Sequence, residues 1–202
     1  MIRFAYPVAA VLALTLSSGA FAADYEIDAG HSSIGFKIRH LVAKVPGTFK
    51  RFEGTFSFDK AKPEASKVET TIQTASIDTG NIKRDDHLTG PDFFDVKKYP
   101  KITFKSTKYE GDDEDGKIHG DLTMHGITKP VVLEAEFTGL ATDPWGNKKI
   151  GFTAKGKIDR KDFGIIWNKK IDAGGLMLSD EVDLIIEIEG TEKAEKKKVA
   201  TK

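Results

Sequence analysis

The chain has 202 residues, which is enough for one domain with a sizeable core or at most two small domains. Its 31 Lys and Arg residues balance 31 Asp and Glu residues, and this neutrality argues against a dedicated nucleic-acid binder. The absence of cysteine excludes disulfides, thiolate metal sites, cysteine nucleophiles and a lipid-modified cysteine anchor.

Residues 1–22 are predicted to be a signal peptide. Arg3 supplies the positive start, an apolar run extends from Phe4 to Leu16, and Ala20-Phe21-Ala22 matches an A-x-A cleavage site. The apolar run is shorter than the roughly 20 residues that span a bilayer. We therefore expect cleavage near Ala22 and a periplasmic or secreted protein with no stable membrane insertion.

Hydrophobic residues alternate with polar ones through most of residues 23–190. Because successive side chains of a strand point to opposite faces, each alternating segment has one dry and one wet face, which is typical of an antiparallel sheet. The pattern predicts eight strands, at about 33–39, 48–58, 67–77, 101–109, 117–125, 130–138, 149–159 and 181–189.

Two segments interrupt this pattern. Residues 81–88 lack alternation, and Thr89-Gly90-Pro91-Asp92 resembles a helix-capping sequence, so a short helix is expected between the third and fourth strands. Residues 159–180 are too long for a simple hairpin loop, and long ordered loops often serve as lids or binding loops. Residues 191–202 contain five lysines and little apolar surface, so they are predicted to be a disordered tail; attraction to an anionic membrane is the alternative.

Eight antiparallel strands are expected to close into a barrel, because closure removes the exposed edges. The interior of such a barrel is either filled by side chains or holds one small ligand. Several predicted inward positions are small, which suits a cavity or a taper equally well, and this pattern leaves both open; they are Gly54, Thr70, Thr74, Ser106, Gly120, Ala135, Ala154 and Gly156.

The sequence contains no familiar catalytic motif, neither H-E-x-x-H nor G-x-S-x-G nor a phosphate-binding glycine loop. His40 continues the inward register of the first predicted strand, so it should face inward at the rim and meet either a ligand head group or a loop. His87 lies on the short predicted helix, where docking of the helix through Leu88 is the simpler interpretation. No catalytic residue and no metal site are predicted.

A set of short motifs in a fixed order resembles the YceI-like lipid/polyisoprenoid-binding family. The motifs are Gly47-Thr48-Phe49, Phe52-Glu53-Gly54, Ser76-Ile77-Asp78-Thr79, Asp92-Phe93-Phe94-Asp95, Gly120-Asp121-Leu122-Thr123, Asp162-Phe163-Gly164-Ile165 and Ser179-Asp180-Glu181-Val182. The resemblance covers residues 24–190. It implies an eight-stranded, lipocalin-like antiparallel barrel that encloses a polyisoprenoid chain, and it carries no established catalytic set.

The leading hypothesis is therefore a non-catalytic carrier or sequestering protein for an isoprenoid lipid, such as a quinone or polyprenyl derivative, with no other cofactor. The residues expected to bind the lipid are Phe36, Ile38, His40, Phe52, Ile72, Arg84, Leu88, Phe94, Phe104, Leu133, Phe152, Phe163 and Trp167. Within this set, Leu88, Phe94, Phe163 and Trp167 should close the mouth, and His40 and Arg84 should meet the head group. The alternatives are an envelope stress or interaction protein with a packed barrel, and a lipid-modifying enzyme using His40 or His87. A second copy of the chain and an envelope protein are kept open as partners.

Overall fold

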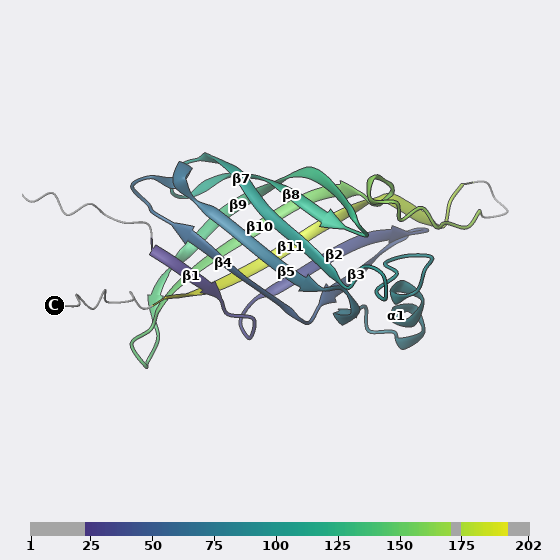
Figure 1. Cartoon of the computed structure of the whole chain (residues 1–202), viewed down its shortest axis with the longest axis horizontal. Coiled ribbons are helices and arrows are strands. Elements are labelled where there is room, and N and C mark those ends of the chain that lie inside the picture. Colours follow the sequence, from purple (N-terminus) through teal and green to yellow (C-terminus); the bar gives the residue numbers. More distant parts are fainter. Residues whose placement is uncertain (1–22, 171–174, 194–202) are drawn as a thin grey trace, which may run out of the picture.

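A computed structural model describes residues 23–170 and 175–193 and shows a closed, eight-stranded antiparallel barrel (Figure 1). The ring runs β1 (Ala23–Ile27), β4 (Phe52–Phe58), β5 (Lys67–Gln73), β7 (Lys101–Gly111), β8 (Asp115–Met124), β9 (Ile127–Thr142), β10 (Lys148–Asp159) and β11 (Leu178–Glu192), and β11 pairs back with β1. The predicted fold class is confirmed.

Three further strands complete the wall along the other half of β11. They are β2 (Ser33–His40), β3 (Ala43–Phe49) and β6 (Ile77–Asp78). In β11, residues 178–187 pair with β2, whereas residues 190–192 pair with β1. Thus β1 and β2 pair with successive parts of the same edge of β11, and the turn between β1 and β2 separates these two pairings.

The prediction of one continuous strand over 48–58 is wrong. The strand structure has a break at Lys50 and Arg51, between the end of β3 and the start of β4. The amide of Lys50 donates to the Ser76 carbonyl (3.0 Å) and that of Arg51 donates to Ser76 Oγ (3.0 Å). Ser76 belongs to a 3₁₀ turn, Thr74–Ser76, which likewise interrupts the strand predicted at 67–77. Strand β1 and residues 43–47 of β3 were not predicted.

The single α-helix of the described residues, α1 (Ile82–Thr89), begins one residue after Asn81. The Asn81 side chain accepts a hydrogen bond from the Arg84 amide (3.1 Å), so Asn81 is the N-cap. The predicted capping role of Thr89 is wrong, since Thr89 is the last helical residue and turns follow it. The placement of a short helix between β6 and β7 is confirmed.

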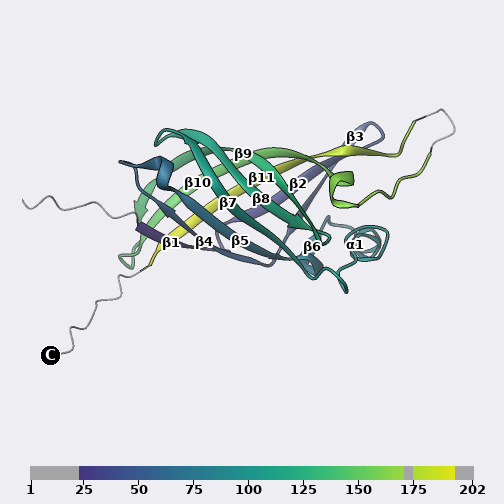
Figure 2. The same cartoon turned by 45° about the horizontal axis from the view of Figure 1, so that its top comes forward.

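Helix α1 and the long segment after β10 lie at the same end of the barrel, as both views show (Figures 1 and 2). That segment starts with a 3₁₀ turn, Arg160–Phe163. The start of β1 and the end of β11 lie at the opposite end. Strand β11 continues to Glu192, two residues into the predicted tail. The predicted signal peptide and the rest of the tail lie outside the described residues, within which no helix is long and apolar enough to cross a bilayer.

Candidate functional site: a two-part apolar cavity

The first part of the site is an inner cavity of about 190 Å³ within the barrel. Its wall is made almost entirely of apolar side chains from all around the sheet, including Ile34, Phe36, Val68, Ile72, Ile102, Phe104, Ile118, Leu133, Ala154, Ile186 and Ile188. These residues point inward because each occupies the dry side of its strand. Such a wall can bind hydrocarbon through burial but offers little to a charged ligand.

A cluster of aromatic rings lies at the end of the inner cavity away from α1. Phe58 contacts Phe152 edge to face, with ring centroids 5.0 Å apart, and stacks on Phe137 at 5.7 Å. Tyr25 stacks on Phe56 at 5.2 Å in the same cluster. The inner cavity therefore extends from this aromatic cluster toward the α1 end.

The second part is a mouth cavity of about 310 Å³ at the α1 end. It is enclosed by β2, by α1 and the turns after it, and by the segment that follows β10. Its apolar lining includes Ile38, Val45, Leu88, Phe93, Phe94, Ile165, Trp167, Met177 and Leu178. The polar groups of the mouth come from His40, Thr79, Arg84, His87 and Arg160.

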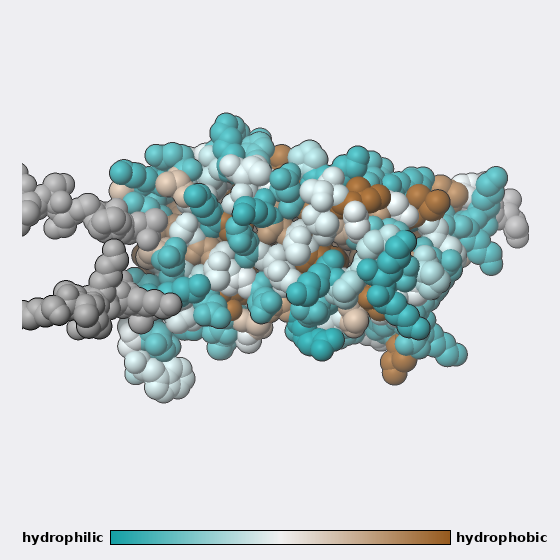
Figure 3. Space-filling view, viewed as in Figure 1, coloured by the Kyte–Doolittle hydropathy of each residue, from teal (hydrophilic) through white to brown (hydrophobic). Residues whose placement is uncertain are grey.

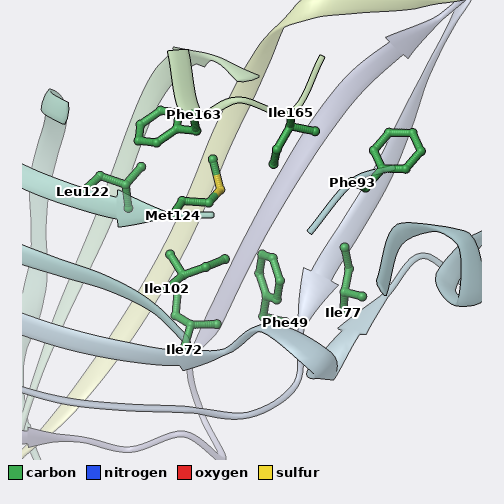
Figure 4. Packing of buried hydrophobic residues seen from close by; sticks show 9 residues of the cluster. All are labelled: Phe49, Ile72, Ile77, Phe93, Ile102, Leu122, Met124, Phe163 and Ile165. Carbon is green, nitrogen blue, oxygen red and sulfur yellow. The ribbon is translucent and has the colours of Figure 1, made fainter. Parts of the chain in front are cut away.

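The two cavities share five lining residues, which are Phe36, Phe49, Met124, Ile158 and Leu184. The rings of Phe36 and Phe49 lie 5.9 Å apart at this junction. Figure 4 shows the surrounding hydrophobic cluster, in which Leu122, Met124, Phe163 and Ile165 face Phe49, Ile72, Ile77 and Ile102. The two cavities therefore meet at this junction, which is bounded by these five side chains.

Polar groups at the mouth are already partly hydrogen-bonded. Arg84 donates from Nε to Thr79 Oγ1 (2.6 Å) and from Nη2 to the Thr79 carbonyl (2.8 Å). His87 Nε2 lies 2.9 Å from Asp92 Oδ2. His40 makes no side-chain hydrogen bond within the described part of the chain. Arg84 and His40 thus keep donor or acceptor capacity toward the cavity they line.

The mouth wall after β10 is held by one buried guanidinium. Arg160 is 3% exposed and donates to the carbonyls of Ile165 (2.7 Å), Trp167 (2.8 Å) and Ser179 (3.0 Å). It also pairs with Asp180 at 3.2 Å. Burial lowers the pKa of Arg160, and the nearby carboxylates of Asp180 and Asp159 oppose that shift.

Aromatic contacts join this wall to α1. The Trp167 ring lies 5.1 Å from both His87 and Phe93, and His87 meets Phe93 edge to face at 5.0 Å. Offset and edge-to-face pairs of this kind add to the stabilisation from burial alone. Trp167 therefore covers the mouth from one side while α1 covers it from the other.

The structure brings together eleven of the thirteen predicted lipid-binding residues. The inner cavity is lined by Phe36, Ile72, Phe104, Leu133 and Phe152, and the mouth by Phe36, Ile38, His40, Arg84, Leu88, Phe94 and Trp167. Phe52 and Phe163 line neither cavity. Phe52 directly follows the break at Lys50 and Arg51 and packs against the core cluster, whereas Phe163 is 1% exposed inside that cluster.

Several lining residues were not among the predicted lipid-binding residues; examples are Phe49, Met124, Ile158, Met177 and Leu184. The inward register is odd-numbered at Val45, Gly47 and Phe49 but even-numbered from Phe52 onward. A single strand over 48–58 therefore could not place Phe49 inside. Leu184 and Ile158 do follow the alternation of their strands, and that signal could have found them.

The small inward residues serve two purposes. Thr70, Ser106, Ala135 and Ala154 line the inner cavity and leave room in it. Gly120 instead makes room for a ring, since a Cβ atom there would lie 2.4 Å from Phe104 Cζ. Some small residues therefore leave space for a cavity, whereas Gly120 accommodates a large neighbouring side chain.

Comparisons with known proteins place this barrel in a family. The YceI-like domain matches residues 25–190. Protein YceI from Escherichia coli O17:K52:H18 is 50% identical over 183 residues, covering 89% of this chain and 93% of the relative. The crystal structure of the YCEI protein from Campylobacter jejuni is 44% identical and aligns with a TM-score of 0.68, covering 83% of this chain and 96% of that one.

A more distant structure shares the fold alone. It is described as a polyisoprenoid binding domain from Saccharophagus degradans, implicated in plant cell wall breakdown. It is 14% identical, with a TM-score of 0.60, and covers 86% of this chain and all of its own. With a domain match over most of its length and a relative that is half identical, this chain belongs to the YceI-like family.

Proposed function

We propose that this protein is a non-catalytic carrier or sequestering protein of the cell envelope that holds an isoprenoid lipid inside its barrel. The observation that carries the proposal is the distribution of polarity along the cavity. The inner part is almost wholly apolar, and the polar side chains gather at the mouth. That arrangement suits an amphiphile with a long hydrocarbon tail and a small polar head.

The cavity dimensions support a tail that extends through both parts. Small-molecule sites usually measure about 300–1,000 Å³. The mouth cavity, at about 310 Å³, is at the lower end of this range, and the inner cavity, at about 190 Å³, is below it. A ligand that passed the junction at Phe36 and Phe49 would bury apolar surface in both.

The head group is proposed to lie beside Arg84 and His40. A quinone presents carbonyl oxygens and a polyprenyl phosphate presents phosphate oxygens, and both accept hydrogen bonds from a guanidinium. The polyisoprenoid-binding description of the Saccharophagus degradans domain and the family membership support the same ligand class. The alternative of an interaction protein with a packed barrel is disfavoured, because the interior contains a cavity.

The two tryptophans allow a direct test. Trp167 lines the mouth, whereas Trp145 is 84% exposed in the turn between β9 and β10. In a Trp145→Phe variant, a quinone bound at the mouth should quench Trp167 emission strongly. In the matched Trp167→Phe variant, the distant Trp145 should show little quenching.

Extraction of the purified protein with organic solvent, followed by mass spectrometry, should recover an isoprenoid lipid. Recovery of none, together with unchanged Trp167 emission on adding quinones of several tail lengths, would overturn the proposal.

A further inference from the structure

Exposed hydrophobic side chains gather around the mouth. Nine large hydrophobic residues are exposed in the described part of the chain, and six belong to segments at the α1 end; these are Leu41, Val42, Ile82, Ile127, Ile166 and Leu176. Val42 is 93% exposed, Ile82 80% and Ile166 68%. On the face seen in Figure 3, strongly hydrophobic surface likewise lies toward this end.

These residues come from separate segments that are tied to one another. The Leu41 amide donates to the Met177 carbonyl (3.0 Å), which joins the β2–β3 turn to the segment containing Leu176. The His87–Trp167 contact joins α1 to the residues beside Ile166. The exposed apolar groups of these segments therefore project at the same end of the barrel, and we call them the apolar tips.

Cations accompany these tips. Arg39, Lys83, Lys169 and Lys170 are exposed, and none forms an ion pair within residues 23–170 and 175–193. Each is within three residues in sequence of an exposed apolar residue of the mouth, except Lys170, which forms a strand bridge with Leu176. The carboxylates of this end that are exposed without such a partner include Asp86, Asp159 and Asp162. Others are paired, as Asp92 is with His87 and Asp180 with Arg160.

We propose that the mouth end docks on the surface of a bilayer that contains anionic lipids. The apolar tips would enter the headgroup region, the four cations would contact lipid phosphates, and the mouth would face the membrane. A lipid surface fits better than a protein because the exposed apolar residues come from separate segments and have unpaired cations close to them in the chain. Docking goes beyond the proposed carrier function and needs no bound lipid.

Flotation with vesicles tests the proposal. The full chain should float with phosphatidylcholine vesicles containing about a third phosphatidylglycerol, and much less with phosphatidylcholine alone. Two triple variants should each bind at least about tenfold more weakly. The first, Val42→Ser, Ile82→Ser, Ile166→Ser, loses the apolar surface that enters the headgroup region. The second, Lys83→Gln, Lys169→Gln, Lys170→Gln, loses three cations, each of which strengthens binding to an anionic surface about fivefold.

The control removes three exposed hydrophobic residues that lie away from the mouth. Val132, Leu140 and Trp145 are 44%, 58% and 84% exposed on β9 and on the turn after it. The triple serine variant of these residues should bind vesicles like the unmodified chain. Equal loss in the control, unchanged binding of both mouth variants, or no flotation of the unmodified chain would overturn the docking proposal.

Two further readouts separate the other outcomes. Self-association in analytical ultracentrifugation that the mouth serine variant abolishes, without flotation of the unmodified chain, would assign the tips to a second copy instead. Quenching of Trp167 by quinone added from detergent reports the carrier function independently. If quenching persists without flotation, docking alone fails; if flotation persists without quenching, the carrier function alone fails.

Discussion

Lys149 lies between two carboxylates on the outside of the barrel. Its ammonium is 2.8 Å from Asp28 Oδ2 and 3.1 Å from Glu189 Oε1, and it also reaches Thr191 Oγ1 at 2.9 Å. His31 Nδ1 lies 3.0 Å from Asp28. Ligand atoms of Asp28, His31 and Glu189 lie within 4.8 Å of one another, but the ammonium already supplies the positive charge that a metal ion would bring. The cluster is thus an ion-pair network that ties the β1–β2 turn to β10 and β11.

The network predicts a pH-dependent contribution to stability. The hydrogen bond from Lys149, followed by that from His31, lowers the pKa of Asp28 from its ordinary 3.8 to about 2. A lowered pKa in the folded state stabilises the protein above about pH 4, and this contribution is lost as the pH falls toward 2. Asp28→Asn should therefore lower the free energy of unfolding by about 1–2 kcal/mol at pH 7, after allowance for solvent screening.

Urea denaturation at pH 7 and at about pH 2.5 measures this effect. The difference between Asp28→Asn and the unmodified protein should shrink at the lower pH. Glu26→Gln is the control, because Glu26 is an exposed carboxylate on the neighbouring β1 and forms no ion pair in the described structure. A difference that is the same at both pH values would contradict the argument.

At the scale of elements, alternation was sufficient to predict the strands that form long ladders. The positions of β2, β7, β8, β9, β10 and β11 follow from it, because each buries one face over many residues. The break at Lys50 and Arg51 was not predictable in the same way. It depends on hydrogen bonds to Ser76, which is 25 residues from Arg51 in the sequence. Local patterns carry no signal for such a contact.

The segment after β10 is ordered by contacts that its own composition also does not reveal. Asn168 bonds to both backbone groups of Leu178, donating from Nδ2 to the carbonyl (2.7 Å) and accepting from the amide (3.0 Å). Arg160 donates to the carbonyls of Ile165 and Trp167 in this segment and to that of Ser179 at the start of β11. Side chains thus replace the ladder hydrogen bonds that this segment lacks, and the mouth wall depends on them.

Arg160→Met should destabilise the segment after β10 that forms the mouth wall. The substitution keeps the apolar stem but leaves three carbonyls and Asp180 without the guanidinium, which should cost about 2–4 kcal/mol. Urea denaturation should show that loss, and limited proteolysis should show faster cleavage after β10. Arg160→Lys should not rescue it fully, because an ammonium cannot reproduce the planar fork.

Lys161→Met is the control for this prediction. Lys161 contacts the other oxygen of Asp180 at 2.7 Å from an exposed position, so its removal should change stability by less than about 1 kcal/mol. Equal effects of Arg160→Met and Lys161→Met would show that the surface pair, and not the buried fork, holds the wall.

At the scale of the molecule, the sequence indicated a barrel with an apolar interior but not how that interior is divided. Inward positions such as Phe36, Phe104 and Leu133 follow from alternation within single strands. The two cavities adjoin where residues from β2, β3, β8, β10 and β11 meet. Only the closed barrel sets the distances between those strands, so the junction could not be predicted from any one of them.

The proposed path of the lipid tail past this junction can be tested by filling the inner cavity alone. Ala154 is 8% exposed, lines that cavity and pairs with Ala135 on β9 and Ile186 on β11. In the Trp145→Phe background, Ala154→Phe should leave the affinity for short-tailed quinones unchanged and weaken that for long-tailed ones. If the ring introduced by Ala154→Phe excluded even two methylene groups of the tail from the cavity, the affinity would fall about tenfold, because burial of each methylene contributes about 0.8 kcal/mol. Lys155→Phe, which adds the same ring at an exposed position of β10, should leave both affinities unchanged. Because the mouth is intact in Ala154→Phe, a parallel loss for short and long tails, or none for either, would show that the tail does not enter the inner cavity.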